Sequence, residues 1–476
     1  MALPATASAA PVLVVAEHGQ RLRSEPVPVR ASRLPIPSPA ARPSIAPRVT
    51  ESRVDAVRRA VSAAAARDRI DATDKRKYLG NYSAALRAYR SLGGQRRSEL
   101  GYVIGVAQSL ARSGRLEPSR MPIVFLTLHR NTEWWRKAGP PPSGRRIQFG
   151  GSRVIFQYFP GRGLQFHPLG NFGLLNGYWY DKKDQNLRSL ADDLVSIAAV
   201  RAGFTTWEYY FAFGGGSPPW ISGMAQGTAM QALSRAGVRL GDSRLLAVAR
   251  RARGAFARRT PVGVRVPTGS GAWYALYSFD PHMNVLNGQL QAVNGLRTYA
   301  EHANDARAQQ LFETGDRLAR SVIRSFDTGA WSLYSRPFGR SGGEADLNYH
   351  TLNRDFARNL CKGTKSEAYC DEADRFTRYL KEDPEFEPYR AVPSPARAGR
   401  GMRVKFHLSK IAKVAFSVRE GGKTYYSTSA TLARGAHFFR WVPPRFKSEH
   451  TYTFRLSARD LAGNGNTVDG EARVKP

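Results

Sequence analysis

Residues 211–233, FAFGGGSPPWISGMAQGTAMQAL, predict a loop that turns into a helix. The glycine triplet and the proline pair end the preceding segment, and the helical run begins after Trp220. Gly223 and Gly227 are four residues apart, so they lie on one stripe of that helix. Bare backbone on this stripe allows close approach of a second helix or of a ligand. The stretch therefore predicts either close helix packing or a carbohydrate cleft with Gln226 as its hydrogen-bonding group.

The same layout recurs twice towards the C-terminus. A loop at 268–283 leads into a helical pattern at 285–300, and a loop at 331–348 leads into another at 349–360. A second helical pattern follows each of these after a short turn. The repeated unit is a long loop, an inner helix, a short turn and an outer helix. This repeat predicts an α/α toroid (an incomplete α/α barrel) over residues 171–383, with its long loops forming a cleft.

The chain before the toroid has three parts. Residues 1–50 are rich in Pro, Ala and Arg and predict a disordered or extended arm. Residues 51–120 predict a helical region. Residues 121–170 predict a small β-element, with strands at 122–128, 145–149 and 153–160. A glycine-rich loop at 161–170 carries Gln165 and His167.

The C-terminal quarter changes character. Residues 384–401 predict a linker, and residues 402–476 alternate apolar and polar positions. This alternation, with a DLAGN turn at 460–464, predicts a β-sandwich of immunoglobulin or fibronectin type. The expected fold class is multidomain α+β: an α/α toroid preceded by a small β-element and followed by a β-sandwich.

Composition narrows the expected partner. Lys and Arg total 72 against 38 Asp and Glu, a net charge of +34. This excess predicts attraction to a polyanion, although charge spread along the whole chain is equally typical of a solvated surface. No apolar run is long enough to predict a membrane span. Phosphate-loop, dinucleotide, nucleophile-elbow and HExxH motifs are missing, so no cofactor and no metal are expected. Of the possible polyanions, which are nucleic acid, an anionic membrane and an acidic polysaccharide, we expect the polysaccharide and no nucleic acid.

The start of the chain and its cysteines bear on location. MALPATASAAP, at residues 1–11, resembles the small-residue end of a truncated secretory signal, or is simply an Ala/Pro-rich terminus. Cys361 and Cys370 are nine residues apart and would form one local disulfide in an exported protein, or two free thiols in the cytosol. We expect a secreted or cell-envelope protein.

Tyrosine, tryptophan and arginine gather at the ends of the predicted loops. Aromatic faces stack on sugars, and arginine binds carboxylates. A tyrosine can move a proton if a neighbouring cation lowers its pKa, so Tyr334 with Arg336 and Tyr349 with His350 are candidate pairs; core packing is the alternative. Three carboxylates in or near loops also allow an alternative, in which two of them act as a pair in hydrolysis. The loop-end residues are Trp273, Tyr274, Tyr277, Tyr334, Arg336, Tyr349 and His350, and the carboxylates are Glu208, Asp280 and Glu344.

Three blocks carry a family resemblance. They are WISGMAQG at 220–227, WYALYS at 273–278 with VLNG at 285–288, and WSLYSR at 331–336 with NYHTLN at 348–353. In this order they resemble the C-terminal catalytic domain of the D-glucuronyl C5-epimerases over roughly residues 150–380. The chain looks like a bacterial homologue with an added C-terminal module.

The resemblance implies an activity and a set of site residues. The family removes the C5 proton of glucuronate in heparosan-type polysaccharides and returns one to the opposite face; a homodimer is also implied. Tyr277 and Tyr349 would carry protons, with Tyr334 as a third active-site tyrosine. Arg336 and His350 would hold the carboxylate. The residues expected to bind substrate are Trp220, Gln226, Asn287, Gln165 and His167.

One departure from the family keeps other functions open. Leu276 stands where the family commonly carries a glutamate before the tyrosine at Tyr277. Another base, such as His350 or Glu208, would then serve. The alternatives are a uronate polysaccharide lyase, which removes the same proton and expels the C4 substituent, or a non-catalytic glycan- or cell-wall-binding protein.

Overall fold

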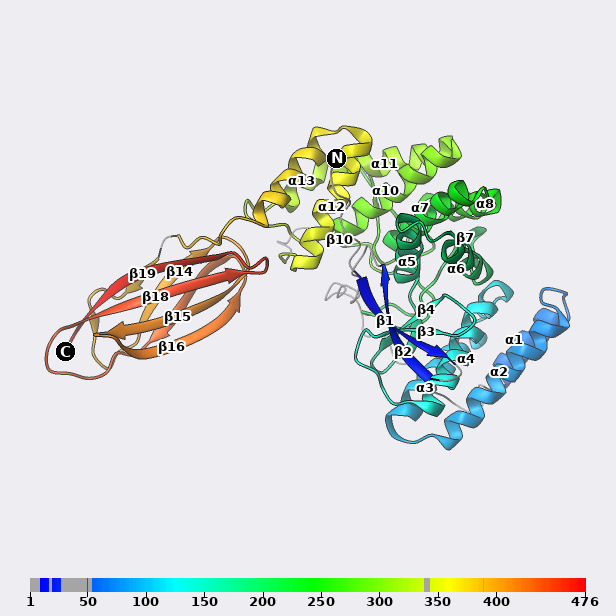
Figure 1. Cartoon of the computed structure of the whole chain (residues 1–476), viewed down its shortest axis with the longest axis horizontal. Helices are drawn as coiled ribbons and strands as arrows, with labels where there is room; N and C mark the ends of the chain where they lie inside the picture. Colours follow the sequence, from blue (N-terminus) through cyan, green and yellow to red (C-terminus); the bar gives the residue numbers. More distant parts are fainter. Residues whose placement is uncertain (1–8, 17–18, 27–48, 50–53, 338–342, 388) are drawn as a thin grey trace. The chain divides into compact units, whose positions relative to one another are not determined.

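The computed structural model describes residues 9–16, 19–26, 49, 54–337, 343–387 and 389–476, as a mixture of helix and sheet (Figure 1). The chain divides into two compact units. The first unit is Met1–Asn284 with Gln291–Ala319, and the second is Val285–Leu290 with Arg320–Pro476. The expected signal remnant falls mostly on residues 1–8, outside the described residues.

After two N-terminal strands, the first unit continues with four helices. They are α1 (Val54–Ala65), α2 (Ala72–Ser91), α3 (Gly94–Arg112) and α4 (Met121–Lys137). The strand predicted at 122–128 is wrong, because this segment is the start of α4. Phe125, Leu128 and Trp135 are buried at spacings of three and seven residues, which place them on one face of a helix. A short apolar run does not separate strand from helix, and here the aromatic residues that continue the pattern decide for helix.

A five-stranded sheet follows these helices. Its strands β3 (Arg146–Phe149), β4 (Ile155–Phe159) and β5 (Gly163–Phe166) pair in order, and β1 (Ala9–Ala16) pairs parallel to β3, with β2 (Gly19–Pro26) at the edge. Residues 9–16 and 19–26 of the expected arm therefore contribute two strands to this sheet. The loop predicted at 161–170 is also corrected, because it contains β5 and the start of the next helix.

The rest of the first unit is mainly helical. Its short strands are β6 (Ala199–Arg201), β7 (Phe204–Thr206), β8 (Arg265–Thr268), β9 (Gly271–Tyr274) and β10 (Met283–Val285). Its helices are α5 (Pro168–Tyr180), α6 (Asp184–Ser196), α7 (Gly223–Leu240), α8 (Ser243–Ala252), α9 (Gly254–Ala257), α10 (Leu286–Ala303) and α11 (Ala306–Val322), of which β10, α10 and α11 extend across the division between the units.

The glycines of α7 allow it to pack closely on α10. A Cβ on Gly227 would lie 2.7 Å from the Cα of Ala292, and one on Gly295 would lie 2.1 Å from the carbonyl oxygen of Gly227. A hydrogen bond joins the same two helices next to these glycines, because the Gln291 amide donates to the Thr228 hydroxyl at 3.1 Å. Of the two readings of the glycine stripe, close helix packing is confirmed.

The second unit joins a helical hairpin to a β-sandwich. The 3-10 turn η3 (Ile323–Phe326) and β11 (Ser335–Pro337) precede α12 (Leu347–Thr364) and α13 (Glu367–Tyr379), which lie side by side in Figure 1. The predicted disulfide is confirmed: Cys361 and Cys370 are bonded at 2.09 Å and connect these two helices.

The sandwich contains eight strands in two sheets that share one core. Phe406 and Trp441 from one sheet pack with Phe416 and Leu456 from the other. The linker predicted at 384–401 is not a free tether, because it supplies two of these strands. The strands are β12 (Arg390–Val392), β13 (Ala396–Arg397), β14 (Met402–Leu408), β15 (Ala412–Glu420), β16 (Lys423–Leu432), β17 (Gly435–Trp441), β18 (His450–Asp460) and β19 (Gly465–Lys475).

Polar contacts fix the sandwich to the rest of its unit. The Glu344 carboxylate accepts the backbone N–H of Ile411 at 2.8 Å and that of Arg434 at 2.7 Å. The buried Lys410 ammonium donates to the carbonyl of Tyr379, at the end of α13, at 2.9 Å. Glu344, one of the carboxylates considered for hydrolysis, is therefore held by the sandwich loops.

Two buried carboxyl groups lie together, one on α13 and one directly after η3. The side chains of Asp327 and Glu372 are each 1% exposed, and Tyr379 donates its hydroxyl to Asp327 at 3.0 Å. Arg324 and Arg375 lie within 3.6 Å of Glu372. Burial, followed by the charge of Asp327 and a hydrogen bond to it, raises the pKa of Glu372 to about 7.

This raised pKa predicts a pH-dependent stability. Between pH 4.5 and about 7 the folded state binds a proton at Glu372 that the unfolded state has released. The free energy of unfolding should therefore fall as pH rises through this window, by up to about 1.4 kcal/mol per pH unit. Urea unfolding at stepped pH measures the slope. Glu372→Gln should remove this contribution, whereas Glu382→Gln, on a half-exposed carboxylate, should keep it; equal slopes in all three proteins would contradict the prediction.

Candidate functional site

Two of the predicted blocks meet through their backbones in the first unit. The N–H of Ile221 donates to the Ser278 hydroxyl at 3.1 Å, and the N–H of Ser278 donates to the Ile221 carbonyl at 2.9 Å. The N–H of Gly223 donates to the carbonyl of Ala275 at 2.9 Å, and a Cβ on Gly223 would lie 2.7 Å from that oxygen. The entry to α7 and the Tyr277 loop are therefore one connected structure.

Tyr277 lies in an aromatic cluster built on this joint. Its ring stacks on Phe279 at 5.4 Å and meets the edges of Trp220 and Phe213 at 5.5 and 5.6 Å. Trp220 in turn stacks on Tyr209 at 4.1 Å and is 1% exposed. This burial contradicts the prediction that Trp220 lines a cleft, since it leaves no ring face open to a sugar. Trp220 instead packs behind Tyr277.

Gln226 is also used inside the fold. Its side-chain oxygen accepts the Thr206 hydroxyl at 3.1 Å, and its nitrogen donates to the carbonyls of Thr205 and Ala252 at 2.8 and 3.2 Å. These bonds tie α7 to β7 and to the end of α8. The predicted role of Gln226 as a substrate ligand is contradicted, because its amide is buried and fully engaged.

Glu208 belongs to a buried ionic network. Arg120 donates to both of its carboxylate oxygens, at 2.7 and 3.0 Å, and Arg201 donates at 2.9 Å. The Tyr210 hydroxyl adds a bond at 2.8 Å, and burial, followed by the charge of Glu208, raises the pKa of Tyr210. Two guanidinium groups and a phenol occupy the oxygens of Glu208, so we do not assign it the role of the missing glutamate.

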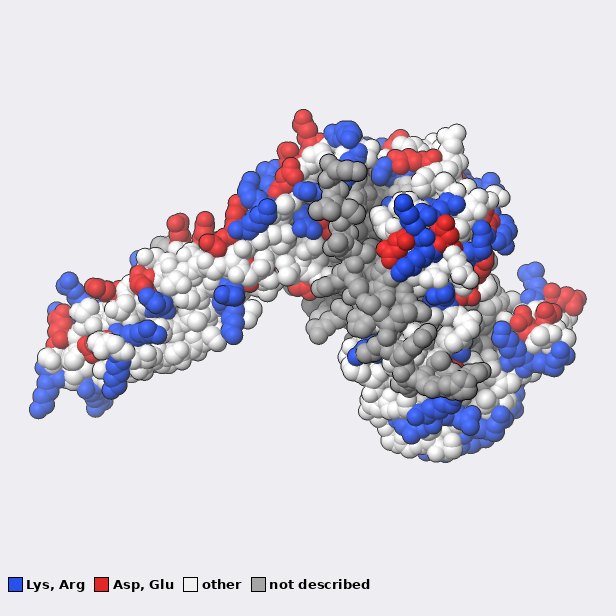
Figure 2. All heavy atoms as spheres, viewed as in Figure 1, with Lys and Arg blue, Asp and Glu red and all other residues white. Residues whose placement is uncertain are grey.

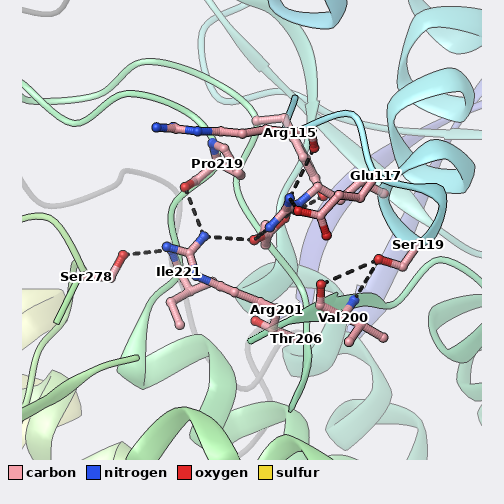
Figure 3. Close-up of polar contacts among 12 residues, drawn as sticks. Arg115, Glu117, Ser119, Val200, Arg201, Thr206, Pro219, Ile221 and Ser278 are labelled. Atoms are coloured by element: carbon pink, nitrogen blue, oxygen red, sulfur yellow. Dashed lines mark hydrogen bonds and ion pairs between the residues drawn. The ribbon is translucent and has the colours of Figure 1, made fainter. Parts of the chain in front are cut away.

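The network also supports the joint between the two blocks. Arg201 donates to the carbonyl of Pro219 at 3.2 Å, directly before Trp220. Figure 3 shows Arg201 beside Pro219, with Ile221 and Ser278 bonded next to them. Glu208 thus acts as an anchor for the entry to α7.

The sheet of the first unit carries a buried polar row. Arg146, Gln157 and Gln165 are cross-strand partners on neighbouring strands and are all buried. The Gln165 amide donates to the carbonyl of Arg162. Sequence reasoning missed Arg146 and Gln157, although their alternate positions in strands predicted next to each other were a usable signal.

His167 stands at the end of this row, at the start of α5. Its Nδ1 accepts the N–H of Gly170 at 2.9 Å, so the ring proton lies on Nε2. Burial, followed by the charge of Arg146, lowers the pKa of His167 to about 3, and the ring stays neutral. Nε2 is buried and has no hydrogen-bond partner among the described residues. The ring therefore offers one neutral N–H donor.

In the second unit, Asn287 and Tyr334 carry buried polar groups without a described partner, as His167 does in the first unit. Asn287 is fully buried, and neither of its side-chain polar atoms has a partner among the described residues. The N–H of the preceding Leu286 donates to the carbonyl of Tyr334 at 3.3 Å. The Tyr334 hydroxyl is likewise buried without a described partner, and its ring lies 4.7 Å from that of Tyr349.

The predicted pairing of Tyr334 with Arg336 is wrong. Arg336 is exposed and donates to the carbonyl of Ser325 at 3.1 Å. Burial, followed by the charges of Tyr349 and Asp346, raises the pKa of Tyr334 well above its usual value. Tyr334 is therefore a phenol that can donate a hydrogen bond.

His350 is a core histidine. Its Nε2 donates to the carbonyl of Phe376 at 2.9 Å, and its Nδ1 lies 2.8 Å from the Ser332 hydroxyl. The ring stacks on Trp331 at 3.7 Å, and burial lowers its pKa to about 4. Both nitrogens are used, which contradicts a role for His350 as base or in holding a substrate carboxylate.

Within the described ranges, no three His, Cys, Asp or Glu side chains gather as a metal site. Every helix in those ranges is too short or too polar to cross a bilayer.

Comparisons with known proteins point to one family. A family model described as the D-glucuronyl C5-epimerase C-terminus matches residues 202–378. A D-glucuronyl C5-epimerase of Caenorhabditis elegans is 28% identical over 178 residues, which are 34% of this chain and 29% of that protein. This chain therefore matches less than a third of that relative's length.

Solved structures give a weaker likeness. A D-mannose isomerase is 12% identical and has a TM-score of 0.36, with 66% of this chain and 88% of that chain covered. A cellobiose 2-epimerase from Bacillus thermoamylovorans is 10% identical with a TM-score of 0.35, over 55% and 72% of the two chains. These scores are too low to support an argument about architecture.

Proposed function

We propose that the chain epimerises uronate residues of an acidic, heparosan-like polysaccharide at C5, because residues 202–378 match a family model described as the D-glucuronyl C5-epimerase C-terminus. The C5–H bond breaks on one face of the ring and a new C5–H bond forms on the other. The electron pair is held meanwhile by the adjacent carboxylate as an enediolate. Two proton-carrying groups and donors to that carboxylate are needed.

The observation that carries the proposal is the buried, unpartnered amide of Asn287, which follows Leu286, whose N–H donates to the Tyr334 carbonyl. A buried amide without hydrogen bonds costs on the order of 1–3 kcal/mol. Such a cost is unusual in a folded protein and calls for an explanation. Asn287 lies in one of the blocks that resemble the family, and a substrate hydroxyl or carboxylate would satisfy it.

We assign the roles accordingly. Tyr277 and Tyr349 transfer protons, and Tyr334 donates a hydrogen bond. Arg336 is exposed and uses one donor internally, so it retains donors for a carboxylate. Asn287, Gln165 and His167 bind the sugar. Leu276 is apolar and buried, so the tyrosines act without the family's glutamate.

The proposal extends to architecture and location. The helical hairpins would belong to an α/α toroid, and the sandwich would be of immunoglobulin or fibronectin type. The Cys361–Cys370 disulfide suits an exported protein. A homodimer remains a prediction from the family.

Incubation with heparosan in deuterated water tests the function. Deuterium at C5 with an intact polymer supports the epimerase. A new unsaturated-uronate absorbance would instead favour the lyase, and binding without either change would favour a glycan-binding protein.

Asn287→Leu separates function from stability. Because it removes a buried unsatisfied amide, it should leave the free energy of unfolding unchanged or raise it by about 1 kcal/mol. Deuterium exchange at C5 should fall at least about tenfold, the effect of about 1.4 kcal/mol at the transition state. Urea unfolding and NMR-detected exchange measure the two.

Asn131→Leu is the matched control, because this buried amide is bonded to the backbone of Thr127 and Leu164 at 2.8 and 2.7 Å. It should lower stability by at least about 1–3 kcal/mol. If both variants destabilise equally and exchange survives in Asn287→Leu, the assignment of Asn287 fails.

A further inference from the structure

Five arginines line one depression on the first unit, between α8, α9 and α11. Its cavity volume is about 210 Å³. Figure 2 shows Lys and Arg side chains gathered where Figure 1 places α8. We call this feature the arginine pocket. The residues that line it are Ala202, Gly203, Phe204, Arg250, Arg251, Arg253, Gly254, Ala257, Arg258, Arg307 and Leu311.

Most of these guanidinium groups lack a counter-charge. Arg253 pairs with Asp305, and Arg251 reaches a threonine hydroxyl at 3.4 Å. Arg250, Arg258 and Arg307 are exposed, and their side chains make no hydrogen bond or ion pair with any described residue. The buried network around Glu208 shows the contrast, since both of its arginines share a carboxylate. Like charges converging on one hollow repel one another, and a bound anion relieves that repulsion.

The floor of the arginine pocket is apolar and tightly built. Phe204 is buried beneath it, and a Cβ on Gly254 would lie 2.5 Å from the Cβ of Phe204. The volume is below the roughly 300–1,000 Å³ of sites that enclose a small molecule. A shallow hollow with an arginine rim suits one anionic group of a longer chain that continues beyond it.

We propose that the arginine pocket is a second binding site for an acidic polysaccharide, which it holds through carboxylate or sulfate groups. The planar guanidinium fork binds such groups with two parallel hydrogen bonds. None of the residues that line it belongs to the proposed C5 chemistry. The only lining aromatic ring, Phe204, is buried, so the pocket offers no exposed ring for base stacking, and this favours a polysaccharide over a single-stranded nucleic acid. The choice of polymer rests on the proposed function.

Binding of heparosan and heparin chains by calorimetry tests this site. The triple variant Arg250→Gln, Arg258→Gln, Arg307→Gln should bind at least about tenfold more weakly at low salt, with a shallower salt dependence. The control Arg58→Gln, Arg59→Gln, Arg87→Gln removes the same charge from exposed positions of α1 and α2 and should lose less than about twofold. Heparosan carries carboxylates alone and heparin adds sulfates, so the two polymers separate these anions.

The outcomes are distinguishable from failure of the proposed function. Arginine-dependent binding without C5 exchange would overturn the epimerase and keep the pocket. Normal exchange with equal binding by both triple variants would overturn the pocket, as would absence of binding to either polymer, or an arginine-dependent loss confined to duplex DNA. If the triple variant unfolds, Arg307→Gln alone serves, with an expected loss of about twofold to fivefold against no loss for Arg87→Gln.

Discussion

Replacing Glu208 with alanine is expected to lower the free energy of unfolding by about 3–5 kcal/mol. The substitution leaves Arg120 and Arg201 without their shared carboxylate, and Arg120 is buried. Removing one partner of a buried ion pair exposes the full desolvation cost of the charge that remains. Urea unfolding of the two proteins at the same pH measures the difference.

Glu117→Ala is the natural control. Glu117 also pairs with Arg120, at 2.9 Å, but its side chain is 50% exposed. An exposed ion pair contributes about 1 kcal/mol or less, so this variant should remain close to the wild type. If the two variants lost similar free energies of unfolding, burial of the Glu208 ion pairs would not be the cause of the effect.

Tyr277→Phe should reduce C5 deuterium exchange about 100- to 10,000-fold, the usual effect of removing a general acid or base. Phenylalanine keeps the ring contacts with Phe279 and Trp220, so the fold should be unchanged. Mass spectrometry of recovered polymer measures the exchange, and the thermal midpoint checks folding.

Tyr209→Phe removes a hydroxyl from the same aromatic cluster, where its ring stacks on Trp220. This variant should retain most of the C5 deuterium exchange, because the proposed mechanism gives Tyr209 no role in proton transfer. If Tyr277→Phe stays active while Tyr349→Phe or Tyr334→Phe does not, the proton carrier lies among the tyrosines of the second unit.

The sequence predicted helices well where caps and periodicity coincide. The helix predicted to begin after Trp220 is α7, Gly223–Leu240, because Ser222 caps its start and Gly241 adopts the left-handed conformation at its end. The prediction for segment 122–128 failed because a short, largely apolar run is compatible with a strand and with a helix. The strand β5 was not predicted, because the glycines around it are equally typical of a loop.

Site residues were harder to predict for a different reason. Sequence order identified the blocks that meet, such as those of Trp220 and Tyr277, because loops that precede neighbouring helices converge. Sequence order did not predict which polar side chains form hydrogen bonds within the fold and are therefore unable to bind a substrate. Gln226 and His350 have the residue types of a site, yet backbone carbonyls far along the chain take up their donors.

The contact of Glu344 with the sandwich loops has a consequence for how this part of the molecule unfolds. Glu344 lies between Tyr334 and α12, and both of its oxygens hold backbone N–H groups of the sandwich. Lys410 joins the end of α13 in the same way. The helical hairpin and the sandwich should therefore open together as one cooperative unit in native-state hydrogen exchange. Cutting the chain at 384–401 would then release a partly melted hairpin instead of two independent domains.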